Sequence, residues 1–314
     1  MTTMTAGYTK RLAADSAEIA RGILWRLGRV NPDRVKRHGG YQLDRGRKWL
    51  LRRRTAHPDT RKKPIFIVGS NRSGTQMVCR AIGNSPHGWD YPEGDFSIAF
   101  DRYLLRSDWI IERLIRHAPA PLVPFGSILD SQFTDRLLTR FENARAIWVY
   151  RRYQDAVTSS VGLWGEHQKD WARSVADGDL DRLGPRGERI SAETVRLFRR
   201  LFREDLSAED GGCLYWYIRN QIYFDLELDK DPRVLIVNYE DAVLKKEPAY
   251  RRIFDFLGFP YHFAVVKDVF ADSVGRNPWP GVDARIQDLC DALKARLDDC
   301  YNRTGGEGVG MHAH

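Results

Sequence analysis

The sequence predicts an α/β fold, in which a parallel sheet is flanked by helices on both faces. Three short apolar runs, at residues 64–68, 146–150 and 233–239, have the composition of buried strands. Segments with the apolar spacing of helices separate these runs, and alternating strands and helices are typical of a parallel sheet. A chain of 314 residues is long enough to bury the core of one large domain and to carry an additional arm.

Basic residues are concentrated before the first strand, in three clusters at residues 45–48, 52–54 and 61–63. Residues 11–30 have helical spacing with one apolar face. We therefore expect residues 1–63 to form a basic helical N-terminal arm, residues 64–304 an α/β domain and residues 305–314 a flexible tail. The arm is compatible with packing on the domain, with packing on the second subunit of a homodimer, and with peripheral contact to a membrane surface.

The remaining elements follow in order along the chain. The spacing predicts a helix from Met77, a turn at 84–86, helical structure over 96–117 and a proline-punctuated segment over 118–124. Residues 165–206, which are highly charged and contain three glycines, are expected to be an insertion or a mobile cover. The other predicted helices lie near residues 132–141, from 155 onward, and at 212–228, 248–257 and 283–299.

The segment from Pro64 to Gln76 carries the strongest functional signal. Its apolar strand breaks at Gly69, and small and polar residues then lead into a helix. A strand, a tight turn and a helix N-terminus in this order collect backbone N–H groups at one point, where the helix dipole also favours an anion. Arg72 adds a positive charge, so we interpret the segment as a phosphate-binding loop. An ordinary strand–helix turn is the alternative.

This loop is P-loop-like but differs from a Walker A motif. Walker A has Lys and then Ser or Thr directly after its second glycine, to contact the outer phosphates and Mg²⁺. Here Gly74 is followed by Thr75 and Gln76, and the cation, Arg72, precedes it. A guanidinium suits two-pronged contact with oxyanions and binds no metal. The pattern therefore favours a metal-free anionic donor over Mg-ATP, and a P-loop small-molecule kinase is one alternative.

A second anion-binding pattern follows the strand at 146–150. Arg151 stands at its carboxyl end, with Asp155 four residues and Ser159 eight residues later. Ligands of open parallel sheets bind outside the carboxyl ends of the strands. Arg151 and Ser159 could therefore contact one phosphate, although helix capping with a surface ion pair would leave the same pattern. Together, the two patterns suit a donor with phosphates at both ends.

These motifs resemble those of the sulfotransferases that use 3′-phosphoadenosine 5′-phosphosulfate (PAPS). Residues 67–75 resemble the 5′-phosphosulfate loop of the branch with Arg-Ser-Gly-Thr, which includes tyrosylprotein and many bacterial sulfotransferases. Residues 147–159 resemble the 3′-phosphate motif. Residues 234–241 and 256–260 are similar to a third signature, a Tyr-Glu strand end followed by a Phe-Leu-Gly turn. The resemblance spans residues 64–301 and implies the fold and the activity of that family.

The resemblance also implies a set of donor-binding residues. In this chain they are Arg72, Ser73, Gly74, Thr75 and Gln76 for the 5′-phosphosulfate, Arg151 and Ser159 for the 3′-phosphate, and Arg276 for a late basic segment that closes over the nucleotide. Gln76 replaces a usual Thr or Ser, and its amide can still donate a hydrogen bond. Arg152 and Ser160 are neighbours of the two 3′-phosphate residues and rank below them.

Sulfuryl transfer to a hydroxyl group needs in-line positioning, stabilisation of the leaving phosphate and a general base. By the resemblance, Arg72 would stabilise the leaving group. Glu93 is predicted as the base, because it follows the loop helix at about the distance at which Glu-using members of the family place theirs. A solvated loop carboxylate is the alternative for Glu93. Further candidates are Asp95 and His87 as bases, and Asp130 and Ser131 on the acceptor side.

Composition narrows the choice of partners. The formal net charge of +8 could attract nucleic acid, but no nucleic-acid motif accompanies it. No apolar run of about 18 residues and no signal peptide are evident, so we expect a cytoplasmic protein, with membrane-peripheral contact left open. The four cysteines lack metal-ligand spacing, so no metal is expected. The predicted acceptor bears a hydroxyl group, as carbohydrates and lipids do. A non-catalytic nucleotide-binding protein of the same fold is the second alternative.

Overall fold

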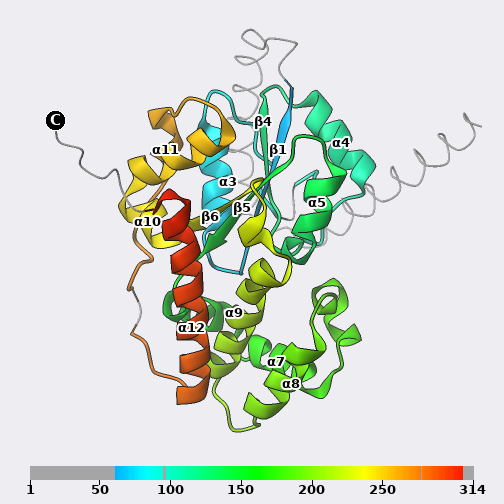
Figure 1. Ribbon diagram of the computed structural model, residues 1–314, viewed down its shortest axis with the longest axis vertical. Coiled ribbons are helices and arrows are strands. Elements are labelled where there is room, and N and C mark those ends of the chain that lie inside the picture. Colours follow the sequence, from blue (N-terminus) through cyan, green and yellow to red (C-terminus); the bar gives the residue numbers. More distant parts are fainter. Residues whose placement is uncertain (1–60, 95–96, 277, 307–314) are drawn as a thin grey trace, which may run out of the picture.

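The computed structural model describes residues 61–94, 97–276 and 278–306. The predicted arm therefore lies almost entirely outside the described residues, as does most of the predicted tail. The domain is built on a sheet of four parallel strands in the order β4-β1-β5-β6 (Figure 1). The strands are β1 (Lys63–Gly69), β4 (Leu122–Gly126), β5 (Arg145–Tyr150) and β6 (Val234–Asn238). The parallel α/β fold predicted from the sequence is confirmed.

Helices cover both faces of this sheet, because successive strand residues point to opposite sides and nearly all of them are apolar. On one face Ile65 and Ile67 pack with Ile147 and Val149 beneath three helices. These helices are α3 (Thr75–Asn84), α10 (Tyr239–Leu244) and α11 (Lys246–Leu257), which lie on the same side of the sheet in Figure 1.

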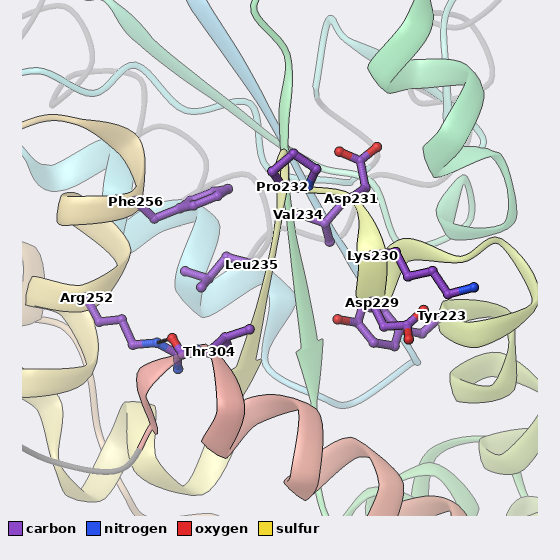
Figure 2. A pocket seen from close by; sticks show the side chains of 10 residues that line it. All are labelled: Tyr223, Asp229, Lys230, Asp231, Pro232, Val234, Leu235, Arg252, Phe256 and Thr304. Atoms are coloured by element: carbon purple, nitrogen blue, oxygen red, sulfur yellow. Dashed lines mark hydrogen bonds between the residues drawn. The ribbon is translucent and has the colours of Figure 1, made fainter.

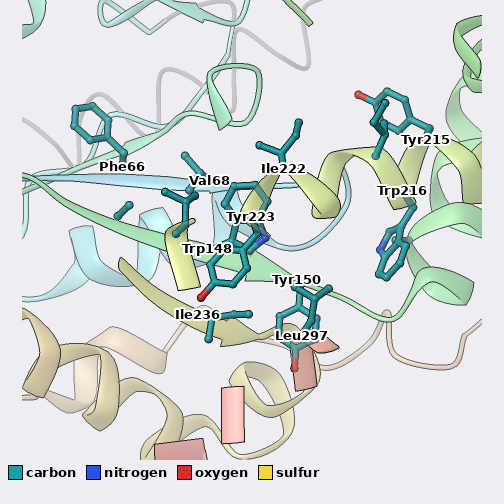
Figure 3. Close-up of a cluster of buried hydrophobic side chains, with 14 of the residues drawn as sticks. Phe66, Val68, Trp148, Tyr150, Tyr215, Trp216, Ile222, Tyr223, Ile236 and Leu297 are labelled. Carbon is teal, nitrogen blue, oxygen red and sulfur yellow. The ribbon is translucent and has the colours of Figure 1, made fainter. Parts of the chain in front are cut away.

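The opposite face contributes to the larger apolar cluster, which is rich in aromatic side chains. Trp148 of β5 packs against Tyr223 with ring centroids 5.5 Å apart, and Figure 3 shows both beside Ile236. The helices on this face include α4 (Asp108–His117), α5 (Thr134–Arg140), α9 (Ala208–Asp225) and α12 (Ala284–Tyr301). The helices predicted near 132–141, 212–228 and 283–299 are thus confirmed.

Three further helices lie beyond the carboxyl end of the sheet or lead toward that region. They are α6 (Tyr153–Trp164), α7 (His167–Asp177) and α8 (Ala192–Leu201), and Figure 1 shows α7 and α8 against α9. Trp171, Val175 and Phe198 from this region are buried in the larger cluster. The charged segment 165–206 is therefore folded onto the domain through an apolar face.

The structure corrects two predicted elements. The helix expected over 96–117 begins only at Asp108, and a short hairpin precedes it, formed by β2 (Phe100–Asp101) and β3 (Leu104–Leu105). Arg102 and Tyr103 turn this hairpin with φ of 46° and 70°, values that a helix cannot accommodate. The proline-punctuated segment 118–124 contains part of β4, which was not predicted as a strand. It is an edge strand of the sheet, where the missing N–H of Pro124 is tolerated.

None of the helices within the described part of the chain has the length and apolar character needed to cross a membrane. Two short connecting elements matter for the site. A 3₁₀ turn at Ser131–Phe133 precedes α5, and a loop that contains Ser273 and Gly275 precedes α12. Both lie near the carboxyl ends of β1 and β5, as the contacts described below show.

Candidate functional site

The loop between β1 and α3 requires glycine at both ends. Gly69 has φ of +140°, and a Cβ atom there would lie 2.2 Å from the Val149 carbonyl oxygen. Gly74 has φ of +91°, and a Cβ atom there would lie 2.3 Å from the Tyr239 ring. Between them the chain turns sharply, and Ser73 Oγ donates to the Ser70 carbonyl oxygen at 2.7 Å. The loop is therefore packed closely against β5 and the first residue of α10, and α3 begins directly after it at Thr75.

Two neighbouring elements hold the loop in this shape. The Gly69 N–H donates to Ser131 Oγ at 2.9 Å, and that hydroxyl also lies 2.7 Å from the Ile128 carbonyl oxygen. On the other side, the Tyr215 hydroxyl of α9 donates to Asn71 Oδ1 at 3.0 Å. Ser131, expected on the acceptor side, is buried and serves to fix the end of β1.

The two predicted anion-binding motifs meet in space. Arg72 Nε donates to Ser159 Oγ at 2.9 Å, and Arg151 Nη1 donates to the Arg72 carbonyl oxygen at 3.2 Å. Burial and the neighbouring Arg151 charge both lower the pKa of Arg72. An arginine stays protonated in proteins, so the lowered pKa indicates that the charged form of Arg72 is destabilised at this position. A bound anion would stabilise it.

Arg151 is almost fully buried, with 4% of its surface exposed. Its guanidinium lies over the Tyr239 ring at 4.5 Å, contacts Asp155 at 3.5 Å and donates through Nη2 to the Ser273 carbonyl oxygen. Its Nε is buried and has no hydrogen-bond partner within the described residues. A buried, unpaired N–H of a cation is a costly feature that a phosphate oxygen would satisfy.

The late segment that contains Arg276 is brought to the same place. The Gly275 N–H donates to Asp155 Oδ2 at 3.1 Å, and the Tyr239 hydroxyl lies 2.6 Å from Ser273 Oγ. Arg276 itself is exposed. Arg152 pairs with Asp155 at 2.8 Å, whereas Arg151 contacts the same carboxylate at 3.5 Å and also donates to the loop at the Arg72 carbonyl oxygen.

Glu93 reaches the carboxyl edge of the sheet because residues 88–91 run parallel to β4. Gly88 bridges to Leu122 and Tyr91 bridges to Phe125, and the Tyr91 N–H donates to the Pro124 carbonyl oxygen at 2.8 Å. His87 lies four residues before Tyr91, and its carbonyl oxygen accepts from the Leu122 N–H at the amino end of β4. The structure therefore separates His87 from the loop, whereas Glu93 lies beside it. Asp95 lies outside the described residues.

The surroundings of Glu93 involve both its backbone and its side chain. Its backbone N–H donates to Gln76 Oε1 at 3.0 Å, and the backbone of Leu129 acts on its carboxyl group to lower its pKa. The Glu93 Oε1 atom is buried and has no hydrogen-bond partner among the residues that the structure describes. Burial, and then the charge of Asp130, raise the pKa of Glu93 to about 8. A carboxyl group in this state is a strong candidate for a general base.

Asp130 and Arg219 are two further buried charged residues in this region. Asp130 Oδ2 accepts from the Leu105 N–H at 3.0 Å, and burial raises the pKa of Asp130 to about 7. Arg219 of α9 is fully buried and donates to Gln132 Oε1 at 2.7 Å and to the Ile128 carbonyl oxygen at 2.8 Å. The edge of the sheet thus carries cations over the loop and carboxyl groups beside it.

Residues 62–275 match the sequence profile of the sulfotransferase domain. The chain belongs to the sulfotransferase family. Its members use PAPS, so the resemblance stated from the motifs is confirmed and the kinase alternative is wrong. No curated protein sequence matches this sulfotransferase.

The chain also has low similarity to three solved structures described as sulfotransferases. The sulfotransferase domain of the Synechococcus PCC 7002 olefin synthase is 16% identical, with a TM-score of 0.40 over 81% of this chain and 99% of that one. A sulfotransferase from Alicyclobacillus acidocaldarius is 16% identical, with a TM-score of 0.39 over 78% and 96%. The mouse sulfotransferase SULT7A1 complexed with PAP is 14% identical, with a TM-score of 0.33 over 80% and 88%.

The sulfotransferase also has a pocket that lies away from this site. A pocket of about 410 Å³ lies at the amino end of β6, where Figure 2 shows Leu235 and Phe256 between Arg252 and Asp231. Because the strands are parallel, this pocket is at the opposite end of the sheet from the loop, and no predicted site residue lines it. The described residues contain no cluster of side chains suited to a metal ion.

Sequence reasoning missed two contributors. Arg219 was not singled out, although an arginine among the apolar residues of an aromatic helix is a recognisable signal of a buried cation. Ser273 was also missed, and no pattern marks it because its role depends on a loop that folds back over β5 and β6.

Proposed function

We propose that this sulfotransferase binds PAPS across the two motifs and transfers its sulfuryl group to a hydroxyl acceptor deprotonated by Glu93. The observation that carries the proposal is the junction of the motifs, where Arg72 meets Ser159 at 2.9 Å and Arg151 meets the Arg72 backbone at 3.2 Å. A single ligand with two phosphate groups can contact both motifs there. Glu93 lies at the same edge of the sheet, on the side of Gln76 and Gly126.

The residues present fit such a donor. The loop amides between Gly69 and Thr75, together with Ser73 and Arg72, would hold the 5′-phosphosulfate. Arg151 and Ser159 would hold the 3′-phosphate, and the unpaired Nε of Arg151 would gain a partner. Arg276, exposed on the segment anchored by Gly275, would close over the nucleotide.

Gln76 has a second role in this proposal. Its Oε1 accepts from the Glu93 N–H at 3.0 Å, and its Nε2 donates to the Gly126 carbonyl oxygen at 3.3 Å. Both ends of the amide are therefore engaged in hydrogen bonds. Gln76 links the first turn of α3 to the base, and its direct contact with the donor stays a prediction.

The mechanism follows from these positions. The donor supplies an activated sulfuryl group, and the protein positions it and manages one proton and the developing charge. Glu93 accepts the proton of the acceptor hydroxyl as the new S–O bond forms and the S–O bond to the 5′-phosphate breaks. Arg72 and the loop amides stabilise the negative charge left on that phosphate. Since Glu93 acts only when ionised, turnover rises with pH through its pKa, about 8.

A binding experiment and an activity experiment test the proposal together. Adenosine 3′,5′-bisphosphate should raise the melting temperature of the protein, whereas Mg-ATP should not. Labelled PAPS should transfer its label to a component of a fractionated cell extract, which would also identify the acceptor class. Carbohydrate and lipid fractions are the first to screen.

Two variants separate the proposed roles. Glu93→Gln should abolish transfer and retain binding of the bisphosphate, while Arg151→Ala should mainly weaken that binding. Glu142→Gln is the matched control, because Glu142 is an exposed glutamate between α5 and the amino end of β5, and its substitution should leave both properties unchanged. Full transfer by Glu93→Gln would show that another group is the base. Unchanged affinity in Arg151→Ala would remove it from the donor site.

A further inference from the structure

The late segment, residues 273–276, belongs to no helix or strand, so individual hydrogen bonds decide where it lies. Two of them reach Ser273, whose Oγ lies 2.6 Å from the Tyr239 hydroxyl and whose carbonyl oxygen accepts from Arg151 Nη2. Another is made by the Gly275 N–H, which donates to a buried carboxylate at 3.1 Å. The late segment is thus attached to the donor side at both Ser273 and Gly275.

The carboxylate belongs to Asp155, which is 6% exposed and lies in the first turn of α6. Its Oδ2 accepts from Arg152 Nε at 2.8 Å and its Oδ1 from Arg152 Nη2 at 3.0 Å, while Arg151 lies 3.5 Å away. Burial raises the pKa of Asp155, but the hydrogen bonds from Arg152 and from the Gly275 N–H outweigh burial, so that the pKa is lowered. The group that accepts from the Gly275 N–H is therefore an ionised carboxylate at neutral pH.

The position of Asp155 links the late segment to the predicted 3′-phosphate residues. In the sequence Asp155 is four residues from Arg151 and four from Ser159. Asp155 and Ser159 are both in α6, so this spacing places them on the same face of the helix. Gly275 is held at this face, and Arg276 is the next residue. The contact with Asp155 therefore brings Arg276 close to the predicted 3′-phosphate site.

Asp155 is unsuited to bind the donor directly. Both of its carboxylate oxygens already accept hydrogen bonds from Arg152, and its negative charge would repel a phosphate group. Any effect of Asp155 on the donor must therefore pass through the groups that it contacts. Among these, the Gly275 N–H connects it to the late segment. A hydrogen bond to an ionised acceptor is about twice as strong as one between neutral groups.

We propose that Asp155 is a positioning residue for donor binding, which fastens the late segment over the bound nucleotide by accepting the Gly275 N–H. This inference rests on the proposed donor site. Arg276 is exposed, and its place beside the nucleotide depends on where Gly275 is fixed. When the attachment is lost, the late segment opens more often and the nucleotide dissociates sooner.

Trypsin tests the attachment without any ligand. Cleavage after Arg276, followed by mass spectrometry, reports how often the late segment leaves its place. In Asp155→Asn the side chain keeps its shape and loses its charge, and we expect this cleavage to be about tenfold faster. Asp231→Asn is the matched control, because Asp231 also pairs with Nε and Nη2 of an arginine, Arg233, but lies before the amino end of β6.

Nucleotide release tests the consequence. The dissociation rate constant of adenosine 3′,5′-bisphosphate, measured by surface plasmon resonance, should rise about tenfold in Asp155→Asn, with the association rate constant changed less than about twofold. Gly275→Pro removes the donated N–H, cannot adopt the φ of +63° found at Gly275, and leaves the ion pairs of Asp155 in place. It should therefore cause the same increase. Because both substitutions break one contact, the double variant should release the bisphosphate no faster than either single variant.

The outcomes separate this inference from the proposed function. The parent's rate in either experiment with Asp155→Asn would overturn the role of Asp155, as would equal changes in Asp231→Asn. Additive effects of Asp155→Asn and Gly275→Pro would show that Asp155 acts through another contact and would also contradict the inference. If Asp155→Asn does not fold, unchanged release by Gly275→Pro decides against it. A parent protein that binds no bisphosphate would instead overturn the proposed donor site, and trypsin would still show whether Asp155 fastens the late segment.

Discussion

The donor-side loop, residues 69–76, and the acceptor-side turn, residues 127–132, touch through Gly69 and Ser131 but are stabilised differently. The loop depends on backbone shape, because both of its glycines leave no room for a Cβ atom. Two cationic residues meet there, because the Arg151 guanidinium donates to the Arg72 carbonyl oxygen. Without an anion, this side of the site has an excess of positive charge.

The acceptor-side turn depends instead on a buried side chain. Arg219 reaches it from α9, and the turn carries Asp130, a buried carboxyl group whose pKa is raised. The proposed donor binding and proton abstraction therefore reside in separate structures, which are joined by the hydrogen bonds of Gly69 with Ser131 and of Gln76 with Glu93. We therefore expect a substitution on the donor side to have little effect on the acceptor side, and the reverse. The substitutions below test this separation.

The largest effect is expected from Arg219→Met on the acceptor side. It leaves the Ile128 carbonyl oxygen and the Gln132 side chain without a buried hydrogen-bond donor, and each unsatisfied group costs about 1–3 kcal/mol, so the free energy of unfolding should fall by about 2–6 kcal/mol. Chemical denaturation measures this loss. Arg196→Met on the exposed face of α8 is the control and should change it by less than about 0.5 kcal/mol. Similar losses in both variants would show that the turn does not depend on Arg219.

The next largest effect is expected from Arg72→Ala on the donor side. Loss of one contact to the leaving phosphate should lower kcat by about 10²–10³, or about 2.7–4 kcal/mol of transition-state stabilisation, with the fold intact. Steady-state transfer of label from PAPS measures it. Arg80→Ala, an exposed arginine on the same α3 helix, should retain full activity. Undiminished turnover in Arg72→Ala would remove the loop from the chemistry.

The same division explains how far the sequence could predict this molecule. The loop and Arg151 follow strands directly, so strand–turn–helix patterns over a few residues were sufficient to find them. Their meeting was also foreseeable, because the carboxyl ends of adjacent parallel strands share one edge of the sheet. The actual contact, Arg72 with Ser159, is consistent with that expectation.

The acceptor side could be predicted only in part. Glu93 was named from the resemblance, but its delivery to the site depends on residues 88–91 running beside β4, a strand that its proline concealed. Arg219 lies 126 positions after Glu93 and acts through tertiary packing alone. Neither the pairing of residues 88–91 with β4 nor the packing of Arg219 leaves a periodic or local pattern in the sequence. These two contacts could therefore not be predicted from the sequence by itself.

The smallest effect is expected at the residue that joins the two sides. Gln76→Met removes the hydrogen bonds to the Glu93 N–H and the Gly126 carbonyl and keeps a side chain of similar length. Each such bond contributes about 0.5–1.5 kcal/mol, so kcat should fall roughly threefold to tenfold because Glu93 is less firmly placed. The dissociation constant for adenosine 3′,5′-bisphosphate should stay unchanged, which titration calorimetry measures. Arg151→Ala should give the reverse pattern. If Gln76→Met instead weakened bisphosphate binding at an unchanged kcat, Gln76 would belong to the donor side, as the sequence motif alone suggests.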